Sequence, residues 1–231
     1  MKPASGPALT AALTALTLTT GMIEAVSFLA LGPAFTAVQT GNLLLLGFAV
    51  AGEGGLSPAA STASLGGFTA GAVLGARLES AVERRGRPWF APALLTEAAL
   101  LAAAGAAAWG TVRTGPGLTE PHPGVAALVA VAMGLRNVTT LRAPVPDLTT
   151  TVATRSLTAL LAPLGADNRI AAGAARQGRR LAAVTAMFAG GLLGALLLRA
   201  GAPPAVLLLA VAGTVLATAA GYAAVHRPAR G

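Results

Sequence analysis

The stretch GMIEAVSFLALGPAFTAVQTGNLLLLG, residues 21–47, places a glutamate, a proline and an asparagine between apolar runs. A second stretch of the same kind, GLRNVTTLRAPVPDLTTTVATRSLTALLA, occupies residues 134–162. Ionisable residues inside sequence of membrane-spanning composition are costly, and they commonly mark a pathway or a binding site. We call these stretches the first and the second cassette, and they guide the interpretation of the remaining sequence.

The two cassettes align with one another. Matching their first glycines places Glu24 on Asn137 and Pro33 on Pro146. A one-residue slip after the prolines aligns three further pairs, which are Val38 with Val152, Thr40 with Thr154 and Leu43 with Leu157. The alignment predicts an internal duplication with a polar, helix-breaking element in each copy.

The composition of the chain is typical of a membrane protein. Of the 231 residues, 55% are hydrophobic and 10% are charged, whereas soluble proteins average about 25% charged residues. The mean hydropathy is +0.71, and apolar runs near the ~20 residues that cross a bilayer recur along the chain. We therefore predict an all-α, polytopic membrane protein that forms one integral membrane domain over residues 1–231.

The net charge of +8 does not indicate a nucleic-acid partner. Basic residues gather in short loops and at the C-terminus, as the positive-inside rule requires of cytoplasmic segments. No basic stripe is interleaved with aromatic residues, which proteins that bind single strands need. The lipid bilayer is the expected partner.

Several kinds of chemistry lack the residues that would perform them. The chain has no cysteine, which excludes disulfides, thiolate nucleophiles and Cys-ligated metals. His122 and His226 lie in a loop and a tail, outside any cluster with metal-ligand spacing. No nucleophile-elbow, zinc-protease or phosphate-loop motif occurs. We expect no metal, no cofactor and no enzymatic activity.

Eight apolar segments are predicted, and Gly- and Pro-rich connectors separate most of them. They are 8–31, 36–52, 59–82, 90–112, 123–142, 147–164, 180–199 and 203–225. The basic loops at 83–87 and 167–180 are both expected in the cytoplasm. Three segments separate these loops, and three crossings would place them on opposite sides. One of the three segments is therefore predicted not to cross.

The weakest crossing candidate is 147–164, which carries Asp147 and Arg155. Its counterpart, 36–52, is short and contains Gln39 and Asn42. If both segments re-enter the membrane on the side they came from, every basic cluster and both termini lie in the cytoplasm. Two short full crossings are the alternative.

The predicted architecture is a membrane helix bundle of two repeats, about 8–112 and 123–225. Each repeat has three crossings and one short or re-entrant helix, and an odd number of crossings makes the repeats inverted. Glycines recur in equivalent segments, at 67, 71 and 75 and at 190, 191 and 194. Such GxxxG-type faces favour close helix packing, within the chain or between copies in a homo-oligomer.

The motifs resemble those of the YoaK-type family of bacterial inner-membrane proteins, a domain of unknown function. The first signature is carried by Gly21, Glu24 and Ala25, by residues 28–32 and by Thr40, Gly41 and Asn42. The second is carried by Gly134, Asn137, Arg142, Pro146, Thr149, Thr150 and Thr154. The resemblance covers nearly the whole chain and implies a multi-pass protein of a bacterial inner membrane. Glu24 stands where the family usually has Asp, and Arg155 stands where it usually has Gly.

The candidate pathway or binding residues come from both cassettes. They are Glu24, Pro33, Thr36, Gln39, Thr40, Gly41 and Asn42 in the first and Asn137, Arg142, Pro146, Asp147, Thr150, Thr154 and Arg155 in the second. A proline cannot donate a helical hydrogen bond, so it leaves a preceding carbonyl free. A helix that begins after such a break points its amides at the middle of the membrane, where they favour anions or carbonyl oxygens.

Glu24 and Asn137 are expected to approach each other near the twofold axis, where a buried carboxylate suits proton coupling. The alternative is a structural ion pair of Glu24 with Arg136, Arg142 or Arg155. Outside the cassettes, Glu97 is expected to be a second protonatable group or, preferably, a lone helix-packing residue. The side chains of Arg77 and Glu79 are expected to extend to the membrane interface.

These features favour a transporter or channel for a small solute or ion. A non-transporting scaffold or lipid-interacting protein, in which the cassettes only kink helices, is the first alternative, and an intramembrane enzyme is the second. A pathway predicts a cavity at mid-depth that contains Glu24, Asn42, Asn137 and Thr154.

Overall fold

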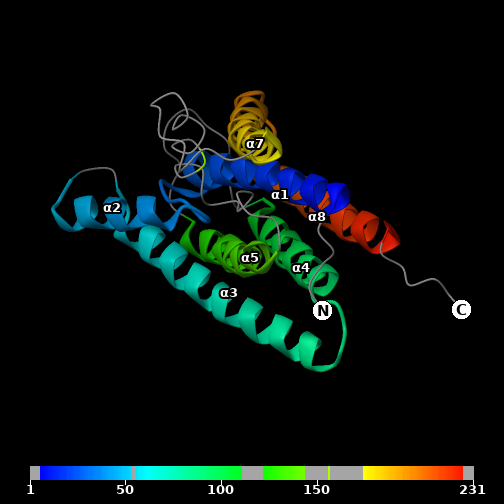
Figure 1. Ribbon diagram of the computed structural model, residues 1–231. Helices are drawn as coiled ribbons and strands as arrows, with labels where there is room; N and C mark the ends of the chain where they lie inside the picture. The colour runs from blue at the N-terminus through cyan, green and yellow to red at the C-terminus, as the bar shows by residue number, and fades with distance from the viewer. Residues whose placement is uncertain (1–5, 54–55, 111–121, 144–155, 157–173, 226–231) are drawn as a thin grey trace, which may run out of the picture.

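The computed structural model describes residues 6–53, 56–110, 122–143, 156 and 174–225 (Figure 1). Within these ranges every regular element is helical, which confirms the all-α prediction. The elements are α1 (Pro7–Val26), the π-helical turn η1 (Ser27–Leu31), α2 (Gln39–Val50), α3 (Pro58–Arg84), α4 (Phe90–Ala108), α5 (Pro123–Arg142), α7 (Ala174–Arg199) and α8 (Pro204–Val225).

Five of the described helices are long and apolar enough to cross a membrane. They are α1 with η1, α4, α5, α8 and the part of α7 from Gln177 to Arg199. The prediction of several helices with the length and composition of membrane spans is therefore confirmed. α3 has 27 residues but is more polar and is not among the five. The 12 residues of α2 extend over about 18 Å, less than the ~30 Å hydrocarbon core.

The helices pack in a definite order. α3 lies against α5, α5 against α4, α4 against α8, α8 against α1, and α1 against α7. In Figure 1, α3 runs along one edge of this arrangement and α7 along the opposite edge. α2 contacts the beginning of α3 and projects away from the other helices (Figure 1). Each outer pair thus joins a helix from the first half of the chain to one from the second.

Glycines bring the outer pairs into backbone contact. A Cβ atom added at any of four glycines would overlap a carbonyl oxygen of the facing helix: Gly21 meets Met187, Gly190 meets Leu18, Gly134 meets Phe68, and Gly71 meets Val131. The expected packing role within the chain is therefore confirmed for Gly71 and Gly190, and the structure adds Gly21 and Gly134, for which the sequence predicts no packing role. They are occupied in contacts between helices of one chain, so an oligomer remains a prediction.

The contacts of the two outer pairs are in matching register. Gly134 follows Gly21 by 113 positions (134 − 21), and Val131 follows Leu18 by the same number (131 − 18). Gly190 follows Gly71 by 119 positions (190 − 71), and Met187 follows Phe68 by the same number (187 − 68). The same four-residue contact therefore occurs twice, once between α1 and α7 and once between α5 and α3.

The outer surface of the bundle is apolar. In α2 the one buried residue is Asn42, whereas Leu43 and Leu44 are 60% and 58% exposed. On α7, Phe188 is 71% exposed. Large apolar side chains outside and a polar one inside are expected of helices that face lipid, because extensive exposed apolar surface marks a membrane or protein contact.

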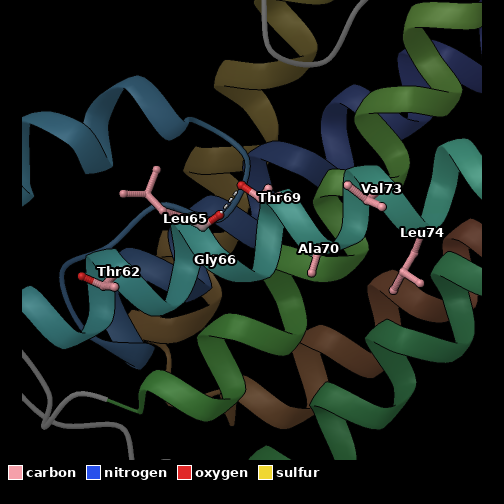
Figure 2. A pocket seen from close by; sticks show the side chains of 7 residues that line it. All are labelled: Thr62, Leu65, Gly66, Thr69, Ala70, Val73 and Leu74. Carbon is pink, nitrogen blue, oxygen red and sulfur yellow. Dashed lines mark hydrogen bonds between the residues drawn. The ribbon is translucent and has the colours of Figure 1, made fainter.

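A shallow hollow on α3 has the same apolar character (Figure 2). Its lining residues all belong to this helix and are Thr62, Leu65, Gly66, Thr69, Ala70, Val73 and Leu74. The Thr69 hydroxyl donates to the Leu65 carbonyl at 2.8 Å, as Figure 2 shows. Because this hydroxyl is already used within the helix and no ionisable residue lines the hollow, it has no features of a polar binding site.

Replacing Gly71 by valine is expected to destabilise the protein, because its Cβ would overlap the Val131 carbonyl. Overpacking of this kind costs about 1–3 kcal/mol. Gly66, on the same helix, has open space around it, so Gly66→Val is the matched control and is expected to change stability by less than about 0.5 kcal/mol. Thermal unfolding of the two variants in detergent measures the difference, and equal melting temperatures would contradict the packing.

Candidate functional site

The first cassette breaks the first membrane helix. α1 passes into the π-helical turn η1, and Gly32 follows with φ +116° and ψ +154°. This backbone conformation is essentially restricted to glycine, and π-helical turns are frequent at functional sites. The carbonyl of Leu31 accepts the amide of His122 at 2.7 Å, so the break does not leave this carbonyl free. From Gly32 to Val38 the chain is irregular, and we call residues 32–38 the connecting segment.

Glu24 binds the far end of the connecting segment. Its carboxylate accepts the Thr36 amide at 3.1 Å and the Ala37 amide at 2.5 Å. The Thr36 hydroxyl donates to the same carboxylate oxygen at 3.2 Å, and the Val38 amide adds a further interaction. The side chain of Glu24 is only 8% exposed. The amides that were expected to face a ligand are therefore occupied by a carboxylate of the chain itself.

Asn42 holds the middle of the connecting segment. Its side-chain oxygen accepts the Phe35 amide at 2.8 Å, and its side-chain nitrogen donates to the Phe35 carbonyl at 2.5 Å. The same nitrogen donates to the Gln39 side chain at 2.8 Å. Asn42 is fully buried. Its amide group thus pairs with both backbone groups of one residue, as a neighbouring peptide would.

Three more side chains complete the hydrogen bonding. The Ser64 hydroxyl of α3 donates to the Phe35 carbonyl at 2.5 Å, and the Ser27 hydroxyl donates to the Ala34 carbonyl at 2.7 Å. The Gln39 side chain donates to the Thr36 carbonyl at 2.9 Å. Non-helical backbone at membrane depth is tolerated only against protein or water, and these side chains supply the protein partners.

The Thr-Gly-Asn element has distinct structural roles. A Cβ atom at Gly41 would lie 2.6 Å from the Phe35 ring, so only glycine leaves room for this ring against α2. The Phe35 ring stacks on Phe28 with 5.0 Å between centroids. Asn42 binds the backbone, as described above, whereas Thr40 is exposed. Thr40 therefore lies outside the cluster that the other residues form.

A groove of about 290 Å³ opens between α1 with η1 and α7. Its lining residues are Gly21, Glu24, Ala25, Phe28, Leu29, Phe35, Met187, Gly191 and Ala195. Of the four residues predicted to share a cavity, Glu24 lines this groove, while Asn42 and Asn137 do not. Thr154 lies outside the described residues.

A second polar cluster links α1, α4 and α5. The guanidinium of Arg136 forms an ion pair with Glu97 and donates to the Thr20 hydroxyl at 2.8 Å and to the Leu16 carbonyl at 3.0 Å. Arg136 is 1% exposed and Glu97 is fully buried. The expectation that Glu97 packs without a partner is wrong, because the charge of a buried carboxylate requires compensation and Arg136 supplies it.

Arg142 belongs to a third polar cluster, at the end of α5. Its guanidinium contacts Glu79 at 3.1 Å and Glu83 at 2.5 Å, and it lies 5.1 Å from the centre of the Trp89 ring. The Thr139 hydroxyl donates to Glu79 at 2.7 Å. Glu79 is fully buried, so the expectation that it extends to the membrane interface is wrong. Arg77, its neighbour in the sequence, is exposed.

The partners of Arg136 and Arg142 also show whether either arginine forms an ion pair with Glu24. An ion pair of Glu24 with Arg136 or Arg142 is excluded, because these arginines bind other glutamates. The Glu24 carboxylate forms no hydrogen bond with Asn137 in the described part of the structure. The remaining predicted residues of the second cassette lie outside the described ranges; they are Pro146, Asp147, Thr150, Thr154 and Arg155.

Comparison with known proteins places the chain in a family. Residues 12–220 match the family described as protein of unknown function (DUF1275). The chain belongs to this family. No curated protein and no solved structure matches the chain. The description of the matching family does not give the name YoaK, so the assignment to a YoaK-type family stays a prediction. Among the described residues, no three His, Asp or Glu side chains are grouped so as to hold a metal ion.

Removing the charge of Arg136 is expected to be more damaging than removing the whole ion pair. Arg136→Met leaves Glu97 charged or forces it to take up a proton, and breaking a buried pair in this way costs about 3–5 kcal/mol. The double variant with Glu97→Leu is expected to recover most of this loss. Thermal unfolding in detergent provides the comparison, with Arg77→Met as the exposed control. A double variant less stable than Arg136→Met would exclude the buried ion pair.

Proposed function

We propose that the protein is a transporter or channel for a small solute, with its polar site in the first cassette. The observation that carries this proposal is Glu24, a carboxylate that holds non-helical backbone between apolar helices and lines a groove. Ionisable groups within membrane helices are rare and commonly belong to substrate or ion pathways. Irregular backbone at this depth is a common feature of transporter binding sites.

The proposed architecture is a pair of inverted repeats whose helices interdigitate, with α4 and α8 at the centre. The packing order of the helices supports it: exchanging α1 with α5, α3 with α7 and α4 with α8 reproduces the same order in reverse. The matching register of the four glycine contacts supports the same exchange. In transporters with such repeats, substrate sites lie near the repeat interface.

We further propose that α2 re-enters the membrane without crossing it. Glu24 precedes Leu31 by seven residues, which is about 10 Å of helix. Because the Thr36 and Ala37 amides bind Glu24, the chain returns by about this distance before α2 begins. The location proposed is a bacterial inner membrane, with both termini in the cytoplasm and no enzymatic activity.

A non-transporting scaffold or lipid-interacting protein is the second candidate function. The hydrogen bonds of Asn42, Ser64 and Ser27 favour it, because they close the connecting segment without water. The two candidates differ in whether solute passes the groove.

Solute release from proteoliposomes tests the transport proposal. Purified protein is reconstituted with chloride, acetate, potassium or glycerol inside the vesicles, and release of at least one is expected to exceed that from protein-free liposomes. Ala195→Trp fills the groove and is expected to reduce that flux about tenfold, equivalent to about 1.4 kcal/mol of barrier. Leu192→Trp, on the exposed side of α7, is the matched control. No flux of any solute, or equal flux through Ala195→Trp and wild type, would favour the scaffold.

Cysteine labelling tests the proposed topology, since the native chain has no cysteine. Arg85→Cys and Gly178→Cys, both at exposed positions, are expected to react with a membrane-impermeant maleimide from the same side. Glu53→Cys is expected to react from the opposite side. Reaction of residues 85 and 178 from different sides of the membrane would rule out the re-entrant arrangement.

A further inference from the structure

We infer that the donors around Glu24 form an anion site and that this carboxylate is a tethered substitute for a small, singly charged anion. The inference rests on the proposed function, because it names the class of solute that the same site would carry. The site is defined by the Thr36 amide, the Thr36 hydroxyl and the Ala37 amide.

The geometry around Glu24 is that of an occupied anion site. All three donors converge on one carboxylate oxygen, at 3.1, 3.2 and 2.5 Å. The Thr36 amide also lies 3.3 Å from the second oxygen. Successive backbone amides of this kind bind anions in many proteins, and α2 begins one residue after Val38, so its dipole adds to the positive potential. A small carboxylate or halide would accept the same bonds.

The charged groups nearby favour a single negative charge. On α5, Arg136 reaches Thr20, one turn from Glu24, but binds Glu97. On α7, the arginines with described side chains nearest to Met187 lie seven or more residues away in the sequence. On α8 the one ionisable side chain is Tyr222, and neither η1 nor α2 has any. Among the described residues, the negative charge is therefore balanced by amide dipoles, which suit a monovalent anion better than a multiply charged one.

The groove gives the Glu24 side chain room to leave the donors. Glu24 lines it together with apolar and small residues, whereas Thr36 and Ala37 are buried behind Glu24 and do not line it. When Glu24 takes up a proton, it loses its charge, and its oxygens accept the amide bonds less strongly. A free anion then occupies the donors and the neutral Glu24 side chain moves into the groove. Glu24 binds one proton from the solvent for each anion admitted, and apart from this O–H bond no covalent bond changes.

Anion-dependent thermal stability tests this exchange. Purified protein in detergent is heated in sodium acetate, sodium chloride or sodium gluconate at equal concentration, gluconate being too bulky for the site. At about pH 8, where a free glutamate is ionised, Glu24→Ala is expected to melt about 3 °C higher in acetate or chloride than in gluconate. Wild type is expected to show no difference at about pH 8 and a smaller one at about pH 5, where a glutamate of ordinary pKa begins to take up its proton. Glu53→Ala, at an exposed glutamate, is the matched control and should behave as wild type.

Glu24→Gln keeps the shape of the side chain without its charge, which guards against misfolding of the alanine variant. It is expected to respond to acetate or chloride equally at both pH values. Folded Glu24→Ala and Glu24→Gln proteins that melt at the same temperature in all three salts would overturn the inference.

The flux assay separates this inference from the proposed function. Glycerol or potassium flux together with salt-independent melting leaves the transport proposal standing and removes the anion site. Anion-specific melting of the Glu24 variants without flux of any solute keeps the anion site and removes transport. Chloride or acetate flux that rises at acidic pH in wild type, but not in Glu24→Gln, supports both.

Discussion

The contact between the Glu24 carboxylate and the Thr36 and Ala37 amides is the constraint on which the first cassette depends. A chain that leaves the helix inside a membrane exposes amides that cannot find water there. An acceptor with several lone pairs is needed at that depth, and one carboxylate provides it for two amides and a hydroxyl. The π-helical turn and the positive φ of Gly32 redirect the chain toward Glu24. The short α2 begins directly after this segment.

The surrounding helices are held together by contacts that do not involve the charge of Glu24. Glycine contacts join α1 to α7 and α5 to α3 through their backbones, and the buried pair of Arg136 and Glu97 ties α5 to α4 and, through Thr20, to α1. A buried ion pair contributes little net stability, but it penalises arrangements in which either charge lacks its partner. Arg136 and Arg142 are thereby paired with other glutamates, and the partners of Glu24 within the described residues are amides and a hydroxyl.

Patterns along the sequence predict those parts of the fold that depend on local periodicity. Apolar runs predict α5 at 123–142 as the structure has it and the other described helices within a few residues, except that α7 begins at 174, six residues before the predicted start. The polar residues of the first cassette are predicted to cluster, and Glu24, Thr36, Gln39 and Asn42 do so. Partners that depend on tertiary packing are not predictable in this way. Glu97 and Arg136 lie 39 residues apart, and Glu79 and Arg142 lie 63 apart, with no repeat to relate them. The direction of the chain after Pro33 depends on the conformation of Gly32, so the sequence does not reveal that Glu24 occupies the amides.

The chemical difference between a carboxylate and a carboxamide explains why Glu24 and Asn42 are not interchangeable. Asn42 both donates to and accepts from Phe35, and a side-chain amide keeps both capacities at any physiological pH. Glu24 faces donors only, so its acceptor strength falls when it binds a proton. Asn42 therefore binds the connecting segment at any physiological pH, whereas protonation weakens the binding of this segment by Glu24. Asn137, at the position equivalent to Glu24 in the second cassette, cannot be weakened in this way. Among the described residues of the two cassettes, the contact that a proton can weaken in this way is therefore the one that Glu24 makes in the first.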